Sequence, residues 1–333
     1  METNITFRDA VCCGTRGGSA AAVSCRMHFG DITLSMVPEV RRALAFSRAH
    51  TCDYSLGGIY MWVRWFGYRC AIVDNTLFIS GMAEGAGRPT PAFAVPVGAM
   101  DRRTAIAAVV SYCRANNITP FFSAVPEESL DVVCGVLGGE ARVEELTDWA
   151  DYLYDAQDLA TLHGKRYNKK RNHVNRFVAD SPHWQMEELT PSLLPETELF
   201  LEGGLSRSAS YDPLQRMADY EHHECLKVLG NWCRFPFVGA VLRGESGEIV
   251  AFSVAEVIGD TAYIHIEKAR HDVPGAGEAV NHFFAAMLVS RHPGLRYLNR
   301  EEDVGDESLR YAKNSYHPLC KLRKYNVYLP KKA

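Results

Sequence analysis

The chain has 333 residues, of which 47% are apolar and 23% charged, and its formal net charge is −4. This composition is typical of a soluble globular protein and allows two domains with sizeable cores. No apolar run approaches the roughly 20 residues that a membrane-spanning helix needs, and the N-terminus lacks the basic and apolar regions of a signal peptide. We therefore expect a cytoplasmic protein without a transmembrane segment.

Residues 1–30 show no clear period and are predicted to be weakly structured. The following stretch, 36–66, has a helical pattern. Asp101 suits the N-cap of a helix that reaches about Asn116, because its side chain can accept a first-turn N–H. Another helix is predicted at Glu127–Leu137. The strands predicted in this half are Tyr68–Asp74, Thr76–Ser80, Ala92–Val97, Pro120–Val125, Arg142–Leu146 and Tyr152–Tyr154.

The second half repeats this order, with helices predicted at Gly277–Ser290 and Glu307–Asn314. Its predicted strands are Phe237–Arg243, Ile249–Val257, Ala262–Lys268, Leu295–Asn299 and one or two strands within Leu319–Leu329. Each half reads strand–strand–strand–helix–strand–helix–strand, the order of an N-acyltransferase domain. The sequence therefore predicts an α+β fold of tandem GNAT-like (acyl-CoA N-acyltransferase) domains, with mixed central sheets flanked by helices. We expect an N-terminal domain at 31–157, and a C-terminal domain at 158–333 that would hold the active site.

The ten cysteines include no C-x-x-C pair, and several lie in apolar runs, as Cys70 does. This pattern predicts reduced thiols and indicates neither a zinc site nor a disulfide framework. His222 and His223 lack the spacing of the H-E-x-x-H zinc helix, so no metal site is expected.

Positive charge is concentrated between Leu162 and Phe177. The basic residues there are Lys165, Arg166, Lys169, Lys170, Arg171 and Arg176. In a helix, Lys165, Lys169 and Arg176 would share one stripe, with apolar residues on the opposite stripe. Such density in an acidic chain indicates a phosphate-rich partner, although a solvated helix face would give the same pattern.

This basic segment resembles the signature of the phosphatidylglycerol lysyltransferase C-terminal-domain family, a branch of the GNAT-like superfamily. Three further pieces match it in order and spacing, namely His265-Ile-Glu-Lys-Ala269, Asn299-Arg-Glu-Glu-Asp-Val-Gly305 and Leu309-Arg-Tyr-Ala-Lys-Asn-Ser-Tyr-His-Pro318. Cys52-Asp-Tyr-Ser55, with the following Trp62, resembles the N-terminal half of the family. The resemblance implies an aminoacyl-tRNA donor, whose phosphates the basic residues would bind.

His265 and Glu267 lie in the predicted strand Ala262–Lys268, where strict alternation would place them on one face. In N-acyl transfer the attacking amine must lose a proton, and a histidine or a carboxylate within reach can accept it. The resemblance favours this catalytic interpretation. A satisfied buried pair or an exposed strand face is the alternative.

Gly275, Ala276 and Gly277 open the next predicted helix and match part of the loop with which acyl-CoA enzymes of the superfamily bind pyrophosphate. Asp272 stands where that loop usually has Gln or Arg, and an anion beside a pyrophosphate is unfavourable. The three residues therefore form either a CoA loop or a simple turn at the helix start.

A run of polar side chains, predicted to bind substrate, follows the strand Leu295–Asn299. It consists of Asn299, Arg300, Glu301, Glu302 and Asp303. The carboxylates would suit a cationic aminoacyl group, and a charged surface loop is the alternative.

The last matching motif contains Lys313 and Tyr316. The resemblance implies that Tyr316 would protonate the leaving group, while Lys313 would lower the pKa of the Tyr316 hydroxyl or hold an ester oxygen. Tyr316 could equally be an aromatic residue at the edge of the core.

Three functions are compatible with these patterns. The first is an acyltransferase that moves an aminoacyl group from aminoacyl-tRNA to a small amine or hydroxyl acceptor, such as a lipid headgroup or a peptide-like group. The second is an acyl-CoA-dependent N-acyltransferase, with a CoA thioester as the donor and the basic residues on its phosphates. The third is a non-catalytic protein on a degenerate transferase fold that binds RNA or, transiently, anionic lipid. The expected partner is tRNA or another phosphate-rich ligand, and the oligomeric state is left open.

Overall fold

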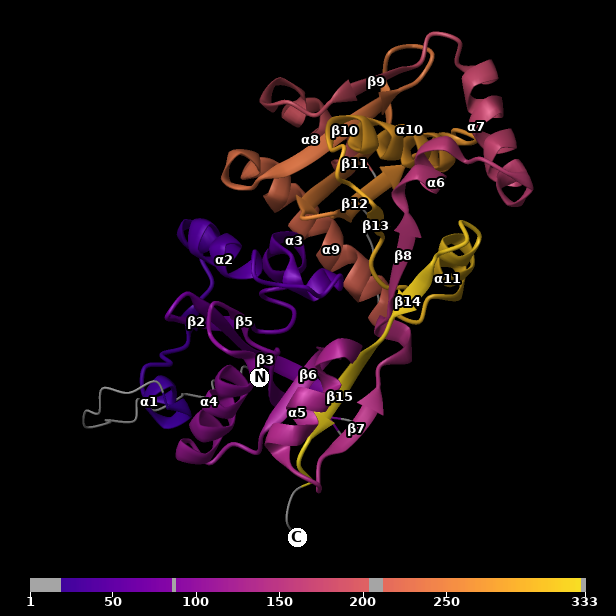
Figure 1. Ribbon diagram of the computed structural model, residues 1–333. Coiled ribbons are helices and arrows are strands. Elements are labelled where there is room, and N and C mark those ends of the chain that lie inside the picture. Colours follow the sequence, from indigo (N-terminus) through magenta and orange to yellow (C-terminus); the bar gives the residue numbers. More distant parts are fainter. Residues whose placement is uncertain (1–18, 86–87, 204–211, 331–333) are drawn as a thin grey trace. The chain divides into compact units, whose positions relative to one another are not determined.

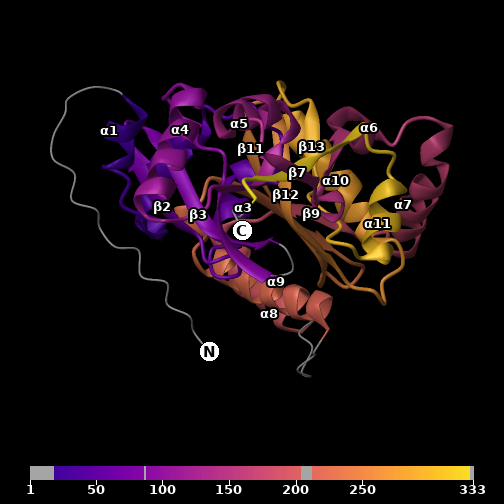
Figure 2. The same ribbon diagram turned by 90° about the horizontal axis from the view of Figure 1, so that it is seen from below.

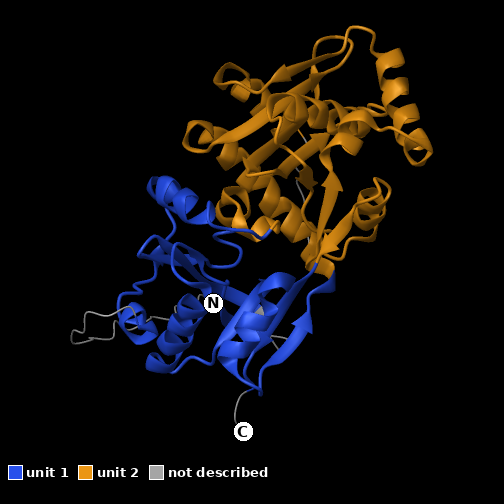
Figure 3. Cartoon of the chain, viewed as in Figure 1, with its two compact units in different colours: residues 1–49, 62–147, 323–333 blue, residues 50–61, 148–322 orange. Residues whose placement is uncertain are grey.

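The computed structural model describes residues 19–85, 88–203 and 212–330 (Figure 1). The chain forms two compact units, each built from separate stretches (Figure 3). Unit 1 comprises Met1–Ala49, Trp62–Thr147 and Arg323–Ala333, and unit 2 comprises His50–Met61 and Asp148–Leu322. The predicted domains, 31–157 and 158–333, are continuous stretches, whereas these units interleave along the chain. Most of the predicted weakly structured segment 1–30 lies outside the described residues.

Unit 1 is built around a mixed sheet with the strand order β1-β2-β3-β4-β6-β15-β7 and β5 paired to β3. The last strand in sequence pairs with both β6 and β7. The strands are β1 (Gly30–Asp31), β2 (Arg69–Val73), β3 (Thr76–Gly85), β4 (Arg88–Phe93), β5 (Val97–Gly98), β6 (Phe121–Pro126), β7 (Arg142–Glu145) and β15 (Lys324–Tyr328). The helices are α1 (Ala20–Ser24), α2 (Val37–Leu44), α4 (Arg102–Ala115) and α5 (Leu130–Leu137). Asp101 caps α4 as predicted, because its carboxylate accepts the N–H of Thr104 at 2.9 Å.

Unit 2 is built around a second mixed sheet with the order β14-β8-β13-β12-β11-β10-β9. Its strands are β8 (Asp151–Asp155), β9 (Gln185–Glu188), β10 (Phe237–Arg243), β11 (Ile249–Ile258), β12 (Thr261–Ala269), β13 (Tyr297–Asn299) and β14 (Cys320–Leu322). The helices are α3 (Leu56–Tyr60), α6 (Ala156–Thr161), α7 (Asn168–Asp180), α8 (Leu194–Glu202), α9 (Pro213–Gly230), α10 (Ala276–Arg291) and α11 (Glu307–Asn314). These two sheets with flanking helices confirm the predicted α+β fold class.

Helices cover both faces of the second sheet (Figure 2). On one face, Phe284 and Leu288 of α10 pack into a buried cluster with Ala262 and Ile264 of β12. On the other face, Phe200 of α8 lies edge-on against Phe252 of β11, with ring centroids 5.8 Å apart. We call these the α10 face and the α8–α9 face.

Three predictions are wrong. The predicted helix 36–66 is broken into α2 and α3, and α3 has its own cap, since Ser55 accepts the N–H of Gly58. The predicted strand Ala92–Val97 is divided between β4 and β5. Cys25 is disulfide-bonded, contrary to the expectation of free thiols throughout.

Among the described helices, none is both long and apolar enough to cross a membrane.

Candidate active site at the end of β12

The hydrogen-bonded ladder between β12 and β13 is short. The two parallel strands pair only from Thr261 to Tyr263, although β12 continues to Ala269. β13 ends at Asn299, where the side-chain oxygen accepts the N–H of Glu301 at 2.7 Å, and Glu301 adopts a left-handed backbone with φ of 57°. From Ile264 onward, β12 therefore has no strand partner on this edge within the described residues. We call this the β12 opening.

A β-bulge changes which side chains of β12 face which helices. Ile264 pairs with Ala255 and Ile266 with Val254, so His265 is an extra residue between them. Beyond the bulge, Glu267 contacts Asn281 of α10 at 3.1 Å, whereas Lys268 contacts Glu221 of α9 at 2.8 Å. The prediction that His265 and Glu267 share a face is therefore wrong, because strict alternation fails at a bulge.

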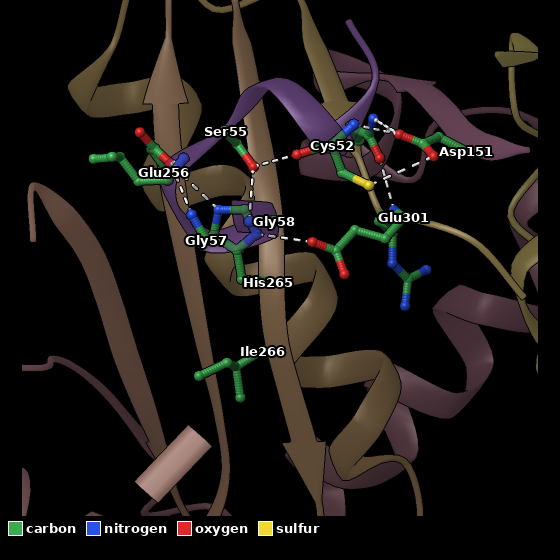
Figure 4. Close-up of polar contacts among 12 residues, drawn as sticks. Cys52, Ser55, Gly57, Gly58, Asp151, Glu256, His265, Ile266 and Glu301 are labelled. Atoms are coloured by element: carbon green, nitrogen blue, oxygen red, sulfur yellow. Dashed lines mark hydrogen bonds and ion pairs between the residues drawn. The ribbon is translucent and has the colours of Figure 1, made fainter. Parts of the chain in front are cut away.

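His265 lies on the α8–α9 face between two carboxylates. Its Nδ1 is 2.8 Å from Glu301 Oε1, and its Nε2 is 3.5 Å from Glu256 Oε2. The imidazole packs directly on Gly57, where a Cβ would lie 2.3 Å from the ring (Figure 4). Burial lowers the pKa of His265, but the two carboxylates outweigh burial and raise the pKa to about 9. At neutral pH the ring is thus an imidazolium, which can hold Glu301 but cannot accept a proton.

Buried carboxylates also fix the segment around α3. Glu256 accepts the backbone N–H groups of Leu56 at 2.7 Å and Gly57 at 3.3 Å. Asp151 accepts the N–H of Cys52 at 2.6 Å (Figure 4). These bonds hold Gly57 against His265. Sequence reasoning missed Glu256, although a lone carboxylate within the apolar run Ile249–Ile258 was a usable signal.

Glu267 lies on the α10 face in a second ion pair. Its Oε1 accepts from Arg300 Nη2 at 2.6 Å, and its Oε2 accepts from Asn281. The Arg300 guanidinium lies 4.8 Å from the ring centroid of Tyr316, and Lys170 Nζ of α7 lies 4.0 Å from the same centroid. The consecutive residues Arg300 and Glu301 therefore bridge the β12 opening on opposite faces of the sheet.

Three sequence-predicted site residues are tied into the surrounding fold. Asn299 is fully buried and donates to Asp151 at 2.7 Å. Asp303, also buried, accepts from Tyr152 Oη at 2.6 Å and from Arg310 at 2.7 Å. Lys313 Nζ donates to the backbone oxygens of Arg300 and Glu302, which fixes the 300–302 turn.

The expected activation of Tyr316 by Lys313 does not occur in this structure. Burial raises the pKa of the Tyr316 hydroxyl, and it lowers the pKa of the Lys313 ammonium. Tyr316 instead lies beside Arg300 and Lys170. The Tyr316 ring thus contacts Lys170 of α7 rather than the ammonium group of Lys313.

The basic segment forms a short 3₁₀ turn, Lys165–Tyr167, followed by α7. Arg171 bends back to the carbonyl oxygen of Gly164 at 2.8 Å, and Lys170 pairs with Glu278 of α10 at 3.4 Å with 12% of its side chain exposed. The exposed basic residues are Lys165, Arg166, Lys169 and Arg176, of which Arg166 pairs with Asp158 and Arg176 with Asp180. Four of the six predicted phosphate-binding residues thus remain at the surface.

The Gly275-Ala276-Gly277 turn has a packing explanation. Gly275 has a φ of 81°, and a Cβ there would lie 2.3 Å from the carbonyl oxygen of His173 in α7. Asp272 is paired with Arg270 at 2.6 Å. These contacts favour the interpretation as a turn at the helix start.

Cys52, Asp53, Asp151 and Glu302 offer potential metal-ligand atoms within 4.8 Å of one another. Cys52 contacts both Asp151 and Glu302 through its sulfur, at 3.6 and 3.2 Å. We assign no metal to this group, because its members already contact one another and the backbone.

The chain matches the family described as "Phosphatidylglycerol lysyltransferase, C-terminal" over residues 44–328. It belongs to this family. It is similar to a conserved protein of unknown function from Bacteroides thetaiotaomicron VPI-5482, with 27% identity and a TM-score of 0.79 over 91% of this chain and 100% of that chain.

Two further structures share the fold. L-PGS from Bacillus licheniformis has 16% identity and a TM-score of 0.56 over 84% of this chain and 93% of that chain. FemX has 8% identity and a TM-score of 0.55 over 91% of this chain and 98% of that chain. These likenesses show that the chain shares its fold of two mixed sheets with flanking helices with both proteins.

Among curated proteins, the chain is 22% identical to an uncharacterised protein, MYCGA3080, from Mycoplasmoides gallisepticum over 53% of this chain. The chain spans about half the length of that relative, 55%.

Proposed function

We propose that this protein is an acyltransferase that moves an aminoacyl group from aminoacyl-tRNA to a small amine or hydroxyl acceptor. The observation that carries this proposal is the β12 opening. There Arg300 pairs with Glu267 on the α10 face of the sheet, and Glu301 pairs with His265 on the α8–α9 face. Lys170 joins this opening to α7, whose exposed side carries basic residues. Membership of a phosphatidylglycerol lysyltransferase family supports the same reaction class.

The chemistry requires little from the protein beyond positioning. An aminoacyl ester is already activated, so holding the amine and the ester together and stabilising the developing oxyanion can supply most of the acceleration. Arg300 is held at the β12 opening by its ion pair with Glu267. Its pKa is raised by Glu267 despite burial, so it stays charged.

The acyl-CoA alternative has less support. The turn at Gly275 is explained by its contact with α7, and Asp272 adds an anion beside the start of α10. The non-catalytic alternative predicts polyanion binding without turnover.

Exchanging Lys165, Lys169 and Arg176 for glutamine should weaken tRNA binding and reduce its salt dependence. Each lost phosphate contact lowers the slope of log K against log salt by about 0.7–0.9, so the triple variant should lose roughly two units. We would measure anisotropy of labelled aminoacyl-tRNA at several salt concentrations, with CoA as competitor.

The matched control exchanges three exposed arginines of unit 1, Arg41, Arg42 and Arg114, for glutamine, which changes the net charge equally. A slope that falls equally in both triple variants would assign the effect to net charge rather than to α7. Displacement of tRNA by CoA would favour the acyl-CoA alternative.

A further inference from the structure

We infer that Glu301, rather than Glu267, accepts the proton from the attacking acceptor, and that Glu256 and His265 position it. This inference rests on the proposed function and names the proton acceptor of that same site. It begins from a geometric difference between two carboxylates that are equally exposed, each with 20% of its side chain accessible.

Glu267 has both carboxylate oxygens engaged. Oε1 accepts from Arg300 at 2.6 Å, and Oε2 accepts from Asn281 at 3.1 Å. Each oxygen of Glu267 thus already has a side-chain donor, one of them a buried guanidinium. Glu267 is therefore suited to anchoring Arg300 at the opening.

Glu301 has one oxygen engaged and one available. Oε1 is held by His265 at 2.8 Å, whereas Oε2 has no hydrogen-bond partner among the described residues, and 20% of the side chain is exposed. Burial of the side chain raises the pKa of Glu301, against the opposing effect of His265. A carboxylate of raised pKa with a free, accessible oxygen is what a general base near neutral pH requires.

The backbone presents this side chain under strain. Glu301 has a φ of 57°, in the left-handed region that non-glycine residues seldom adopt. Two hydrogen bonds fix the turn. The side-chain oxygen of Asn299 accepts the N–H of Glu301, and the backbone N–H of Tyr152 donates to the carbonyl oxygen of Glu301 at 3.1 Å. The fold thus aims Glu301 at His265, on the face opposite to α10.

The acceptor nitrogen attacks the ester carbonyl carbon, a C–N bond forms, and the C–O bond to the tRNA ribose breaks. The nitrogen loses one proton to Glu301 Oε2, and the ribose oxygen takes one proton from solvent. Glu301 then releases its proton to solvent. The charged or titratable groups that act on Glu301 are His265, Glu302, Lys313, Lys268, Cys225 and, through His265, Glu256.

The test compares Glu301→Gln with Glu267→Gln in the full chain. The donor is bulk tRNA charged with mixed amino acids, and the acceptor is methoxyamine, which is uncharged at neutral pH. Glu301→Gln should lower kcat/KM by about 100-fold and remove the acidic limb of the pH–rate profile. Glu267→Gln should lower kcat/KM by about tenfold or less and keep that limb.

A second readout does not depend on turnover. A water-soluble carbodiimide at pH 6, with glycinamide as the trapping amine, should modify Glu301 faster than Glu267 in wild-type protein, as read by peptide mass spectrometry. The inference would be overturned if Glu301→Gln kept the activity of the wild-type protein and the acidic limb of its pH–rate profile, or if the carbodiimide labelled Glu267 faster than Glu301. Either result would leave the proposed function standing. No transfer by wild-type protein would overturn the proposed function itself.

Discussion

Replacing Glu256 by alanine is expected to lower the free energy of unfolding by about 3–5 kcal/mol. The carboxylate is buried, and its loss leaves the N–H groups of Leu56 and Gly57 without their acceptor. It also leaves the buried His265 with one carboxylate instead of two. Urea unfolding at pH 6 measures this effect. Glu140→Ala, which removes an exposed glutamate from unit 1, should change stability by less than about 0.5 kcal/mol.

The effect of Glu256→Ala should depend on pH in a defined direction. The pKa of His265 is raised to about 9 in the folded protein, so its interaction with the carboxylates is fully present below about pH 6.5 and is lost as pH rises through 9. The stability difference between wild type and Glu256→Ala should therefore shrink between these values. A difference that stays constant from pH 6 to pH 10 would mean that Glu256 acts only through the backbone N–H groups.

Replacing Asp303 by alanine is expected to lower the free energy of unfolding by about 2–4 kcal/mol. Asp303 accepts from Tyr152, Arg310 and the N–H of Gly305, and its removal leaves the buried Tyr152 hydroxyl without its shortest hydrogen bond. Burial opposes ionisation, but these donors outweigh burial and hold the pKa of Asp303 at about 2. The stabilisation is thus present above about pH 4 and lost as pH falls through 2.

This variant separates a structural role from the substrate-binding role predicted for Asp303. Chemical unfolding should show the loss of stability in Asp303→Ala, with Asp303→Asn intermediate because the amide can still accept from Tyr152. A fully stable Asp303→Ala protein with weakened donor binding would support the original prediction instead.

Regular elements were predictable here because their periods extend over many residues. The strand Phe237–Arg243 and the helix Glu307–Asn314 have the predicted bounds. The bulge at His265 was not predictable, because it is one unpaired residue whose position depends on the register between β11 and β12. That single residue changed which helix Glu267 faces.

Sequence reasoning named several residues of the candidate site but missed Glu256, and it could not predict which residues pair with one another. The sequence analysis proposed His265 and Glu267 for catalysis and Arg300 and Glu301 for substrate binding. All four lie at the β12 opening in the structure. The pairing itself depends on tertiary contacts, since Arg300 and Glu301 are neighbours in sequence but face opposite sides of the sheet. Lys170 shows the same limit, because its charge indicated a phosphate ligand whereas its position against Tyr316 and Glu278 is set by the packing of α7 on α10.

We propose that this protein transfers aminoacyl groups from aminoacyl-tRNA, and a single-turnover reaction distinguishes this activity from acyl-CoA-dependent transfer. Wild-type protein in excess would be mixed with bulk charged tRNA and methoxyamine, with acetyl-CoA as the donor in a parallel reaction. We expect the aminoacyl ester to be consumed faster than in the protein-free reaction and acetyl-CoA to remain unconsumed. Consumption of acetyl-CoA alone, or an ester half-life equal to that without protein, would contradict this proposal.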